Sequence, residues 1–451
     1  MIDPETAQDR CGQMIELARR AGADAADTVI TGSASESVTV RLGALEDAER
    51  SEDESLSLRV FIGQRSATVS AANFTSAAAQ DMAERAVAMA RLAPEDPHAG
   101  LAPADALING AVTSDLDLVD PQDPDPDRLK QRALMMEDAA RAVAGVTNSQ
   151  GASASFGESV VALGTSHGFI GAYRGTSHGI SASVIAGEGA SMQRDYAYRM
   201  ARHAANLPPC ADIGKLAGKR AVARLDPKTM PSGSMPIMFD PRVSDSLVGH
   251  LLGAMNGAGI ARRSSFLLDR LGDILFPTDI VITDDPHRPR GPRSRLFDGE
   301  GLPTSRSNLV EGGHVTGWLL NAASARQLGL PPTGHASRGG SGAPGVSAAN
   351  VHMHPGTLSR AAMIAEIADG VLVTELVGQG VNPVTGDYSR AASGFRIRDG
   401  ELAEAVSGFT IAGNLLEMYA AMVPADDLEM HNAVNAPTIR VDGMTIAGDT
   451  A

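Results

Sequence analysis

The stretch VSDSLVGHLLGAMNGAG, residues 243–259, decides how the second half of the chain is interpreted. It is apolar and rich in small residues, with one histidine, His250, in its middle. Its length and apolar content predict a long helix over about residues 243–257. Three glycines recur every four residues along it, at Gly249, Gly253 and Gly257. Such a row permits close approach of a neighbouring backbone, so the stretch predicts a packed helix.

A zinc-peptidase helix is the alternative interpretation of this stretch. The familiar arrangement has histidines at i and i+4 with a glutamate beside the first. Here the available pair is Asp245 and His250, at i and i+5, which lie about 140° apart on an ideal helix. The residue after Asp245 is Ser246, which cannot act as a carboxylate base. These residues alone predict a helix without a working metal site.

The sequence around this helix is strand-like and interrupted by turns. The segment LDPKTMPSGSMPIMFDP, residues 225–241, contains four prolines and marks a domain boundary. After the long helix, the chain is rich in glycine and has few helical patterns before GNLLEMYAAM, residues 413–422. We therefore predict one β-dominated C-terminal domain over residues 229–451.

The N-terminal region mixes helical and strand patterns. Amphipathic patterns predict helices over residues 5–21 and 76–93. Between them, SESVTVRLG (35–43) and ESLSLRVFIG (54–63) alternate with period two, as strands do, and the acidic stretch ALEDAERSED separates them. Residues 1–100 are predicted to form an α+β domain.

A central region, residues 101–228, begins with an acidic linker. SDLDLVDPQDPDPDR, residues 114–128, has six aspartates and three prolines, and a helix is predicted near 127–144. Proline disrupts the loop geometry that calcium requires, which favours a solvated linker over a cation site.

The motif GTSHG occurs twice in this β-rich region, at residues 164–168 and 175–179. The spacing predicts a meander, with His167 and His178 at equivalent turns. A paired metal site is the alternative, but no acidic or sulfur ligand accompanies the two histidines in the repeat. The whole chain is therefore predicted to be α+β, with an N-terminal α/β region and a β-dominated C-terminal domain.

Composition limits the classes of partner. The 451 residues contain 38 Lys and Arg against 54 Asp and Glu, a net charge of −16, which argues against nucleic acid as a ligand. Cys11 and Cys210 form no disulfide framework. No apolar run approaches the roughly 20 residues of a membrane span, and no signal-peptide core is evident. We expect a cytoplasmic protein.

Three other segments contain residue types found in metal, catalytic or phosphate-binding sites but lack the full motif of such a site. His352 and His354 share a strand face in VHMHPG, a spacing that can hold a transition metal, but an exposed strand end is the simpler interpretation. The segment 378–395 contains Asp387, Ser389 and Ser393 but no G-x-S-x-G nucleophile motif, which favours a turn or the wall of a substrate groove. The glycine-rich segment 333–345 lacks phosphate-loop order and predicts a mobile loop.

Several segments together resemble the PmbA/TldE proteins of the TldD/PmbA metallopeptidase family. They are LSLRVFIGQRSATVS, MQRDYAY, LVGHLLGAMNGAGIARRSSFL, LFDGEG, TGHASRG, VTELVGQGVNPVTGDYSRAASGF and TIAGNLLEMY. They occur in the same order, and the similarity runs from about residue 36 to the C-terminus. The motif over residues 374–395 is the most specific of them. The resemblance implies a C-terminal domain of the TldD/PmbA type.

The resemblance also implies which parts of a catalytic site are missing. PmbA/TldE proteins pair with TldD proteins in a cytosolic peptidase for unfolded or extended peptides, whose older label is modulator of DNA gyrase. The matching TldD helix contains H-E-x-x-x-H, and a C-terminal cysteine completes the zinc site. Its two histidines fall on Asp245 and His250, and its glutamate falls on Ser246. The region matching the cysteine, residues 429–440, has none. This chain therefore resembles the zinc-less subunit, with no catalytic or metal residue, and zinc is expected in the partner.

The expected partners are a TldD-like catalytic subunit and an unfolded or extended peptide. The sequence leaves open whether the chain forms a homodimer when it is alone. The loops at 333–345 and 378–395 are expected to face a peptide chamber, through the side chains of His335, Asn382, Asp387, Tyr388 and Ser389. Two alternatives remain open. One is a self-sufficient metal-dependent hydrolase using His250 or the His352/His354 pair, and the other is a homodimeric peptide-binding protein.

Overall fold

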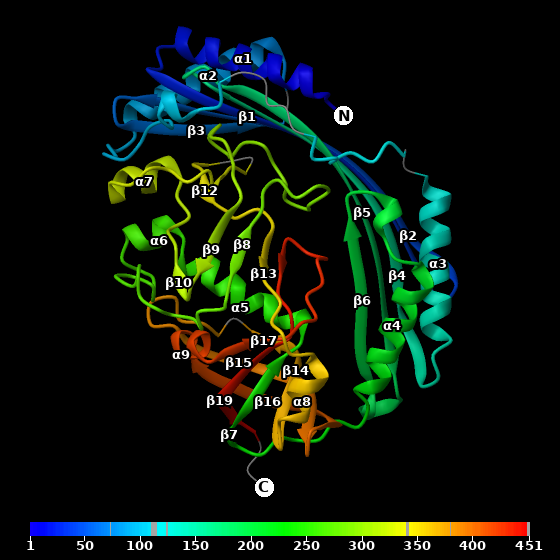
Figure 1. The fold of residues 1–451 in the computed structure, drawn as a ribbon. Helices are drawn as coiled ribbons and strands as arrows, with labels where there is room; N and C mark the ends of the chain where they lie inside the picture. The colour runs from blue at the N-terminus through cyan, green and yellow to red at the C-terminus, as the bar shows by residue number, and fades with distance from the viewer. Residues whose placement is uncertain (73, 110–114, 123–124, 340–341, 379, 449–451) are drawn as a thin grey trace.

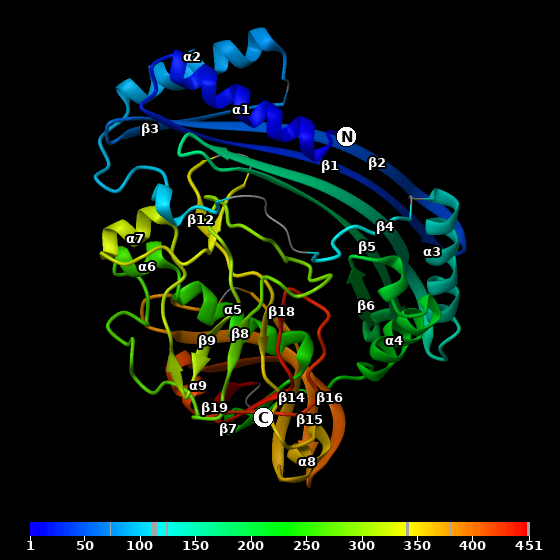
Figure 2. The ribbon, with the colours of Figure 1, turned by 45° about the horizontal axis from the view of Figure 1, so that its top comes forward.

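The computed structural model of the protein describes residues 1–451 except 73, 110–114, 123–124, 340–341, 379 and 449–451 (Figure 1). It has two main parts. A long curved sheet with helices on its outer side is built from the first half of the chain, and the second half lies against the inner side of the curve (Figures 1 and 2). The predicted α+β class is confirmed, and the C-terminal part contains a closed β-barrel.

The curved sheet is antiparallel and six-stranded, in the order β3-β2-β1-β4-β5-β6. Its strands are β1 (Ala25–Arg41), β2 (Ala44–Ile62), β3 (Arg65–Ala71), β4 (Val146–Thr165), β5 (Ile170–Ala186) and β6 (Gln193–Ala201). Because β1 pairs with both β2 and β4, strands from residues 1–100 and 101–228 share this sheet. β6 is therefore an edge strand of this sheet.

The acidic stretch 44–53, expected to separate two strands, is itself part of β2. Leu42 and Gly43 have positive φ angles and form the two-residue turn of a long β1–β2 hairpin. Their backbone amides both donate to the Glu137 carboxylate, at 2.7 and 2.8 Å. The expectation was wrong because residues 44–50 of the strand are exposed on both faces, so they show no apolar alternation.

Four helices cover the outer face of the curved sheet, two at each end (Figure 1). These are α1 (Pro4–Arg20), α2 (Ser76–Leu92), α3 (Pro126–Arg141) and α4 (Cys210–Ala223). Asp3, Thr75 and Asp125 cap the first three through side-chain hydrogen bonds to backbone amides. Each helix buries an alanine-rich stripe, which lets it lie close to the sheet. The three helices expected in this half of the chain are therefore present. Short 3₁₀ turns occur at Ala104–Ala106, Gly189–Ser191 and Ala204–Asn206.

The two GTSHG motifs do not occupy equivalent places. His167 lies in the turn after β4, as expected, and bonds the Ala102 carbonyl at 2.8 Å. His178 lies within β5, buried beside Asp120, with 3.1 Å between its Nε2 and a carboxylate oxygen. Asp120 also accepts from the Ala204 amide at 2.8 Å, so this part of the acidic linker is anchored to the sheet. The expectation of two turn histidines was wrong for His178, because β5 continues through the second repeat.

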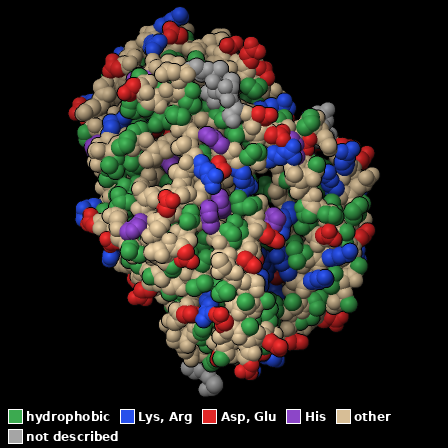
Figure 3. Space-filling view, in the orientation of Figure 1, with side chains coloured by type: hydrophobic (Ala, Val, Ile, Leu, Met, Phe, Trp, Pro, Cys, Tyr) green, Lys and Arg blue, Asp and Glu red, His purple; other side chains and the backbone are tan. Residues whose placement is uncertain are grey.

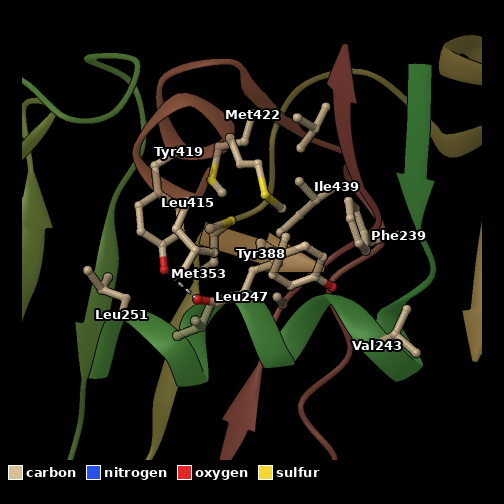
Figure 4. Close-up of a cluster of buried hydrophobic side chains, with 14 of the residues drawn as sticks. Phe239, Val243, Leu247, Leu251, Met353, Tyr388, Leu415, Tyr419, Met422 and Ile439 are labelled. Atoms are coloured by element: carbon tan, nitrogen blue, oxygen red, sulfur yellow. Dashed lines mark hydrogen bonds between the residues drawn. The ribbon is translucent and has the colours of Figure 1, made fainter. Parts of the chain in front are cut away.

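The C-terminal part contains a barrel. β16 pairs with both β15 and β19, so the sheet β16-β15-β14-β7-β19 closes on itself, with β17 beside β19. The strands are β7 (Gly233–Phe239), β14 (Asp369–Val377), β15 (Asp387–Arg398), β16 (Glu401–Asn414), β17 (Met422–Pro424) and β19 (Ile439–Ala447). α5 (Pro241–Ala254) packs its apolar face against the barrel (Figure 4). The Tyr419 hydroxyl donates to the Leu247 carbonyl at 3.0 Å within this core.

A second, smaller sheet lies between the barrel and the curved sheet (Figure 1). Its strands are β8 (Ile282–Asp284), β9 (Ser307–Glu311), β10 (His314–Val315), β13 (Val351–Met353) and β18 (Val434–Asn435). The pair β11 (Ala336–Ser337) and β12 (Gly345–Val346) stands apart. Short helices α6 (Gly257–Ala261), α7 (Ala322–Leu328), α8 (Arg360–Ala365) and α9 (Leu415–Ala420) complete this half.

A buried charge cluster connects the curved sheet to the C-terminal part. Asp27 of β1 forms ion pairs with Arg59 of β2 and with Arg338, which follows β11. All three side chains are less than a tenth exposed. Nearby, Arg326 of α7 donates to three backbone carbonyls of residues 98–101. These contacts hold the two parts together with charge-assisted hydrogen bonds. Among the described residues, no helix is long and apolar enough to span a membrane.

Candidate functional site

The helix predicted over 243–257 is present as α5, but it ends at Ala254. The expected row of close glycine contacts is wrong for two of its three members. A Cβ atom added at Gly249 or Gly253 would meet nothing within 4 Å, whereas one at Gly257 would collide with Leu320 and Ser324. Gly257 begins α6 and packs closely. Gly249 and Gly253 instead lie on the open face of α5, the face that also includes the half-buried Asp245 and His250.

The two positions that matter most for metal chemistry on α5 are Asp245 and Ser246. Burial raises the pKa of the Asp245 carboxyl to about 6, with the Ser246 backbone amide opposing the rise. The Ser246 hydroxyl donates to the Val243 carbonyl at 2.5 Å, within the same helix. It is therefore engaged by the helix backbone.

His250 packs against Tyr388 of β15, with ring centroids 6.0 Å apart and an edge-on angle of 75°. Burial and the nearby Arg390 guanidinium both lower the pKa of His250, so the imidazole is neutral at pH 7. Burial also raises the pKa of Tyr388, which keeps the phenol protonated. Three buried atoms here have no hydrogen-bond partner among the described residues: His250 Nε2, Tyr388 Oη and Arg390 Nε. A neutral imidazole, a phenol and a guanidinium suit a carbonyl or carboxylate oxygen.

The zinc ion implied by the resemblance does not fit this arrangement. The position of the water-activating glutamate is occupied by Ser246, which has no carboxylate. Arg390 places a fixed positive charge beside His250, and that charge would repel a divalent cation. Across the residues that the structure describes, no group of three or more His, Cys, Asp or Glu side chains is placed to hold a metal ion.

The residues expected to face a chamber have different environments. Asp387 and Ser389 of β15 are exposed. Asn382 accepts from the Val384 amide at 2.9 Å, and the Asp387 carboxylate accepts from the Thr385 hydroxyl at 2.6 Å, so both stabilise the turn before β15. Tyr388 is only 1% exposed and belongs to the barrel core (Figure 4). The expectation for Tyr388 is therefore wrong, because side chains alternate along a strand and its neighbours take the outward positions. Residue 379 of this segment lies outside the described residues.

His335 is also buried, in the loop 333–345, of which residues 340–341 lie outside the described residues. Its Nδ1 is 2.8 Å from the Thr333 hydroxyl and its Nε2 is 3.3 Å from an Asp284 carboxylate oxygen. Asp284 accepts in turn from the Ala349 amide at 3.0 Å. This chain of contacts fixes the loop onto β8, and it leaves His335 less than a tenth exposed rather than facing open space.

The His352 and His354 rings stack in parallel on β13 and the residues that follow it, with centroids 5.0 Å apart and an interplanar angle of 9°. His354 Nε2 is 3.0 Å from the Thr283 hydroxyl. Burial lowers the pKa of both imidazoles, and Arg306 lowers it further. The pair is thus a stacked, partly buried strand end near Arg306 and Arg288, with Asp285 as the opposing charge at His352.

Sequence reasoning missed a groove between β6 and the C-terminal part, visible in Figure 3 as a dark hollow with basic side chains along it. It comprises two adjoining cavities of about 240 and 620 Å³, which share Arg199, Glu429 and His431 as lining residues. The walls come from β6, α4, the starts of α5 and α8, and the segment 427–436. One indication of this groove is present in the sequence, the alternating pattern of MQRDYAY in residues 192–198. The other wall residues are far apart in the chain, so no local motif contains them.

Comparison with known proteins gives one family over nearly all of the chain. Residues 26–90, 119–225 and 232–448 match the PmbA/TldA metallopeptidase domain 1, central domain and C-terminal domain. The chain is 36% identical to Metalloprotease PmbA of Escherichia coli O157:H7 over 427 residues, covering 94% of this chain and 92% of that protein. It is 35% identical to the Metalloprotease PmbA homolog of Haemophilus influenzae, covering 96% of this chain and 94% of that protein.

Solved structures share the fold. A candidate modulator of DNA gyrase from Bacteroides thetaiotaomicron superposes with a TM-score of 0.91 at 24% identity, covering 100% of both chains. TldE from Thermococcus kodakarensis superposes with a TM-score of 0.86 at 22% identity, covering 97% of this chain and 99% of that chain. The arrangement of curved sheet and barrel is therefore shared with both. The family expected from the sequence motifs is confirmed.

Proposed function

The chain belongs to the PmbA/TldD metallopeptidase family, and from that premise we propose that it is the PmbA/TldE-type subunit of a two-subunit zinc peptidase. In this proposal a TldD-like partner holds the zinc ion and the catalytic carboxylate. This chain contributes no catalytic residue and no zinc. The assembly works in the cytoplasm and trims unfolded or extended peptides.

The observation that carries the proposal is the charge beside His250. A zinc-bound water needs a metal cation, a base to take its proton and ligands that leave a position open. In this chain the matching helix presents Asp245, Ser246 and His250, and the Arg390 guanidinium is near enough to the remaining histidine to lower its pKa. A guanidinium at that position favours an anion or a carbonyl oxygen and opposes a metal ion.

The chain would then serve the assembly by shaping the space in which a peptide is held. The open face of α5 has room above Gly249 and Gly253, next to the unpartnered atoms of His250, Tyr388 and Arg390. A peptide main chain that lies along this open face would be held without regard to its side chains. The exposed residues Asp387 and Ser389 stand on the same strand as Tyr388 and Arg390.

The test is co-expression with a TldD-like protein, followed by size-exclusion chromatography, zinc analysis and a peptide-cleavage assay on each separated species. We expect a mixed complex with zinc and activity, and an isolated chain with neither. Stoichiometric zinc and cleavage by the isolated chain would establish the self-sufficient hydrolase instead. Failure to co-elute, with a stable homodimer that binds peptide, would establish the homodimeric peptide-binding protein.

A further inference from the structure

The groove beside β6 lies along an unpaired strand edge. β6 ends the order of the curved sheet, and among the described strands β5 alone pairs with it. The carbonyls of Tyr196 and Tyr198 accept from the guanidinium groups of Arg220 and Arg199, at 3.1 and 2.9 Å. Both carbonyls therefore point away from β5. Because alternate residues of a strand direct their N–H and C=O groups to the same edge, the N–H and C=O of Met200 also point into the groove.

The side chains along this edge form a platform. The Tyr196 and Tyr198 rings stack, with centroids 6.2 Å apart and planes at 22°. They are 43% and 42% exposed, and Met200 is 57% exposed. Large apolar surfaces left exposed in a row beside a groove are typical of a binding surface.

The groove wall also has an arginine without a direct ion pair, in a protein whose net charge is −16. Arg199 lies 3.7 Å from Glu429, and Arg360 is 3.0 Å from Asp240. Arg220, half-buried in the same wall, forms no direct ion pair with any described residue and donates to the Tyr196 carbonyl, while Asp195 and Asp240 act on its charge without contacting it. An arginine in this position can donate two parallel hydrogen bonds to a carboxylate.

We propose that the groove binds an extended peptide segment with acidic side chains, which adds to the edge of β6 and places a carboxylate on Arg220. The proposal rests on the proposed function in one respect, that extended peptides are what this chain handles, and it names a binding site for them outside the α5 site. Main-chain pairing with Met200 provides the affinity, and the tyrosine rings contact alternate side chains of the peptide. Arg220 provides the preference for acidic side chains. The carboxylates of Asp240, Asp427 and Glu429 in the same walls oppose a chain that is charged at every residue, so a peptide with separated acidic side chains is favoured over single-stranded nucleic acid.

The test uses the full-length chain alone, without partner or zinc, so its result is independent of the subunit assignment. Binding is measured by fluorescence anisotropy with a short amidated peptide in which valine alternates with glutamate and threonine, and with the same peptide carrying glutamine for glutamate. We expect the acidic peptide to bind more tightly. Arg220→Gln should weaken the affinity for the acidic peptide by about tenfold or more, as expected for the loss of a hydrogen-bonded charge pair. The affinity for the glutamine peptide should not change. Lys219→Gln, an exposed neighbour with the same charge change, is the control and should have no effect.

A second pair of variants tests the strand edge. Met200→Pro removes the outward N–H, which an edge strand tolerates, whereas Met200→Ala keeps it. We expect the proline variant to lose binding of both peptides relative to the alanine variant, with thermal unfolding measured to confirm that both are folded. Equal binding by the two variants, no preference for the acidic peptide, or tight binding of single-stranded oligothymidylate in place of peptide would each overturn the proposal. None of these outcomes would alter the test of co-elution and zinc content.

Discussion

The imidazole of His250 lies edge-on against the ring of Tyr388, 6.0 Å between centroids, and neither His250 Nε2 nor the Tyr388 hydroxyl has a hydrogen-bond partner among the described residues. This contact joins α5, the helix that the sequence resemblance aligns with the zinc helix of TldD, to the barrel strand β15. In a zinc peptidase a histidine at this place would point to a metal ion. Here it meets an aromatic ring and a guanidinium.

The unpartnered hydroxyl gives the first prediction, through a matched pair of buried tyrosines. Tyr388 and Tyr419 are both 1% exposed; the Tyr419 hydroxyl donates to the Leu247 carbonyl, whereas the Tyr388 hydroxyl has only the Arg390 guanidinium nearby and makes no well-formed hydrogen bond to a described residue. Tyr419→Phe should lower the free energy of unfolding by about 1 kcal/mol, and Tyr388→Phe should leave it unchanged or raise it slightly. Urea denaturation of the two variants measures both. A loss at Tyr388 equal to that at Tyr419 would show that the Tyr388 hydroxyl is bonded after all.

The charge beside His250 gives the second prediction. The double variant Asp245→His/Ser246→Glu installs H-E-x-x-x-H on α5, yet it should bind zinc only weakly, because Arg390 remains and no third ligand is present. Adding Arg390→Gln should strengthen zinc binding by about tenfold, since a nearby positive charge is removed. Competition with a chromogenic chelator measures the affinities. Equal affinity with and without Arg390 would contradict the role assigned to this charge.

The third prediction concerns pH and Glu300, which is 4% exposed. Burial raises its pKa from 4.5 to about 7, against the hydrogen bond from the Ala322 amide, and Asp298 and Asp27 raise it further while Arg59 lowers it. The folded protein therefore holds a proton that the unfolded chain has released between these pH values, so this group makes stability fall as pH rises from about 4.5 to 7. Glu300→Gln keeps an acceptor for Ala322 and should stabilise the protein above pH 7, by at most about 3 kcal/mol.

The control for this variant is the exposed Glu401→Gln, which should not change the pH profile. Thermal or urea unfolding of the three proteins across pH 4 to 8 gives the comparison. A Glu300→Gln variant that is less stable than the parent at pH 8 would show that the buried group works as a carboxylate, contrary to this prediction.

The fourth prediction concerns the contact between the two parts of the molecule. Asp27 is the carboxylate between Arg59 and Arg338, and replacing it by asparagine leaves two guanidinium groups buried without their anion. We expect Asp27→Asn to lower the free energy of unfolding by about 3–5 kcal/mol. Glu16→Gln breaks an exposed pair with Arg19 and should cost less than about 1 kcal/mol. Equal effects of the two variants would mean that the buried cluster does not hold the parts together.

Local sequence patterns predicted most of the fold. The helices at 5–21, 76–93 and 127–144 were predictable because each has a capping residue and an apolar stripe, features that depend only on nearby residues. The strand at 44–53 was not, because a strand exposed on both faces has no alternation to detect. The position of His178 within β5 was missed for a related reason, since a repeated motif does not fix where a turn occurs.

The candidate site was predictable only in part. Sequence motifs placed Asp245, Ser246 and His250 on one helix and indicated the family. They could not place the Arg390 charge near His250, because that proximity depends on how β15 packs against α5 in the closed barrel. They also assigned Tyr388 to an open surface, although strand alternation puts it in the core. The groove of Arg199 and Arg220 is formed by residues that only the tertiary fold brings together.

The most direct test of the central claim is a peptide-cleavage assay on the two-subunit complex, assembled with a TldD-like partner in which the glutamate of H-E-x-x-x-H is replaced by glutamine. If all of the chemistry resides in the partner, this complex should form normally, retain zinc and cleave no peptide, while wild-type partner with Asp245→Asn/His250→Gln in this chain should keep full zinc content and substantial cleavage. Cleavage that persists with the inactivated partner, or zinc that is lost with the variant of this chain, would contradict the account.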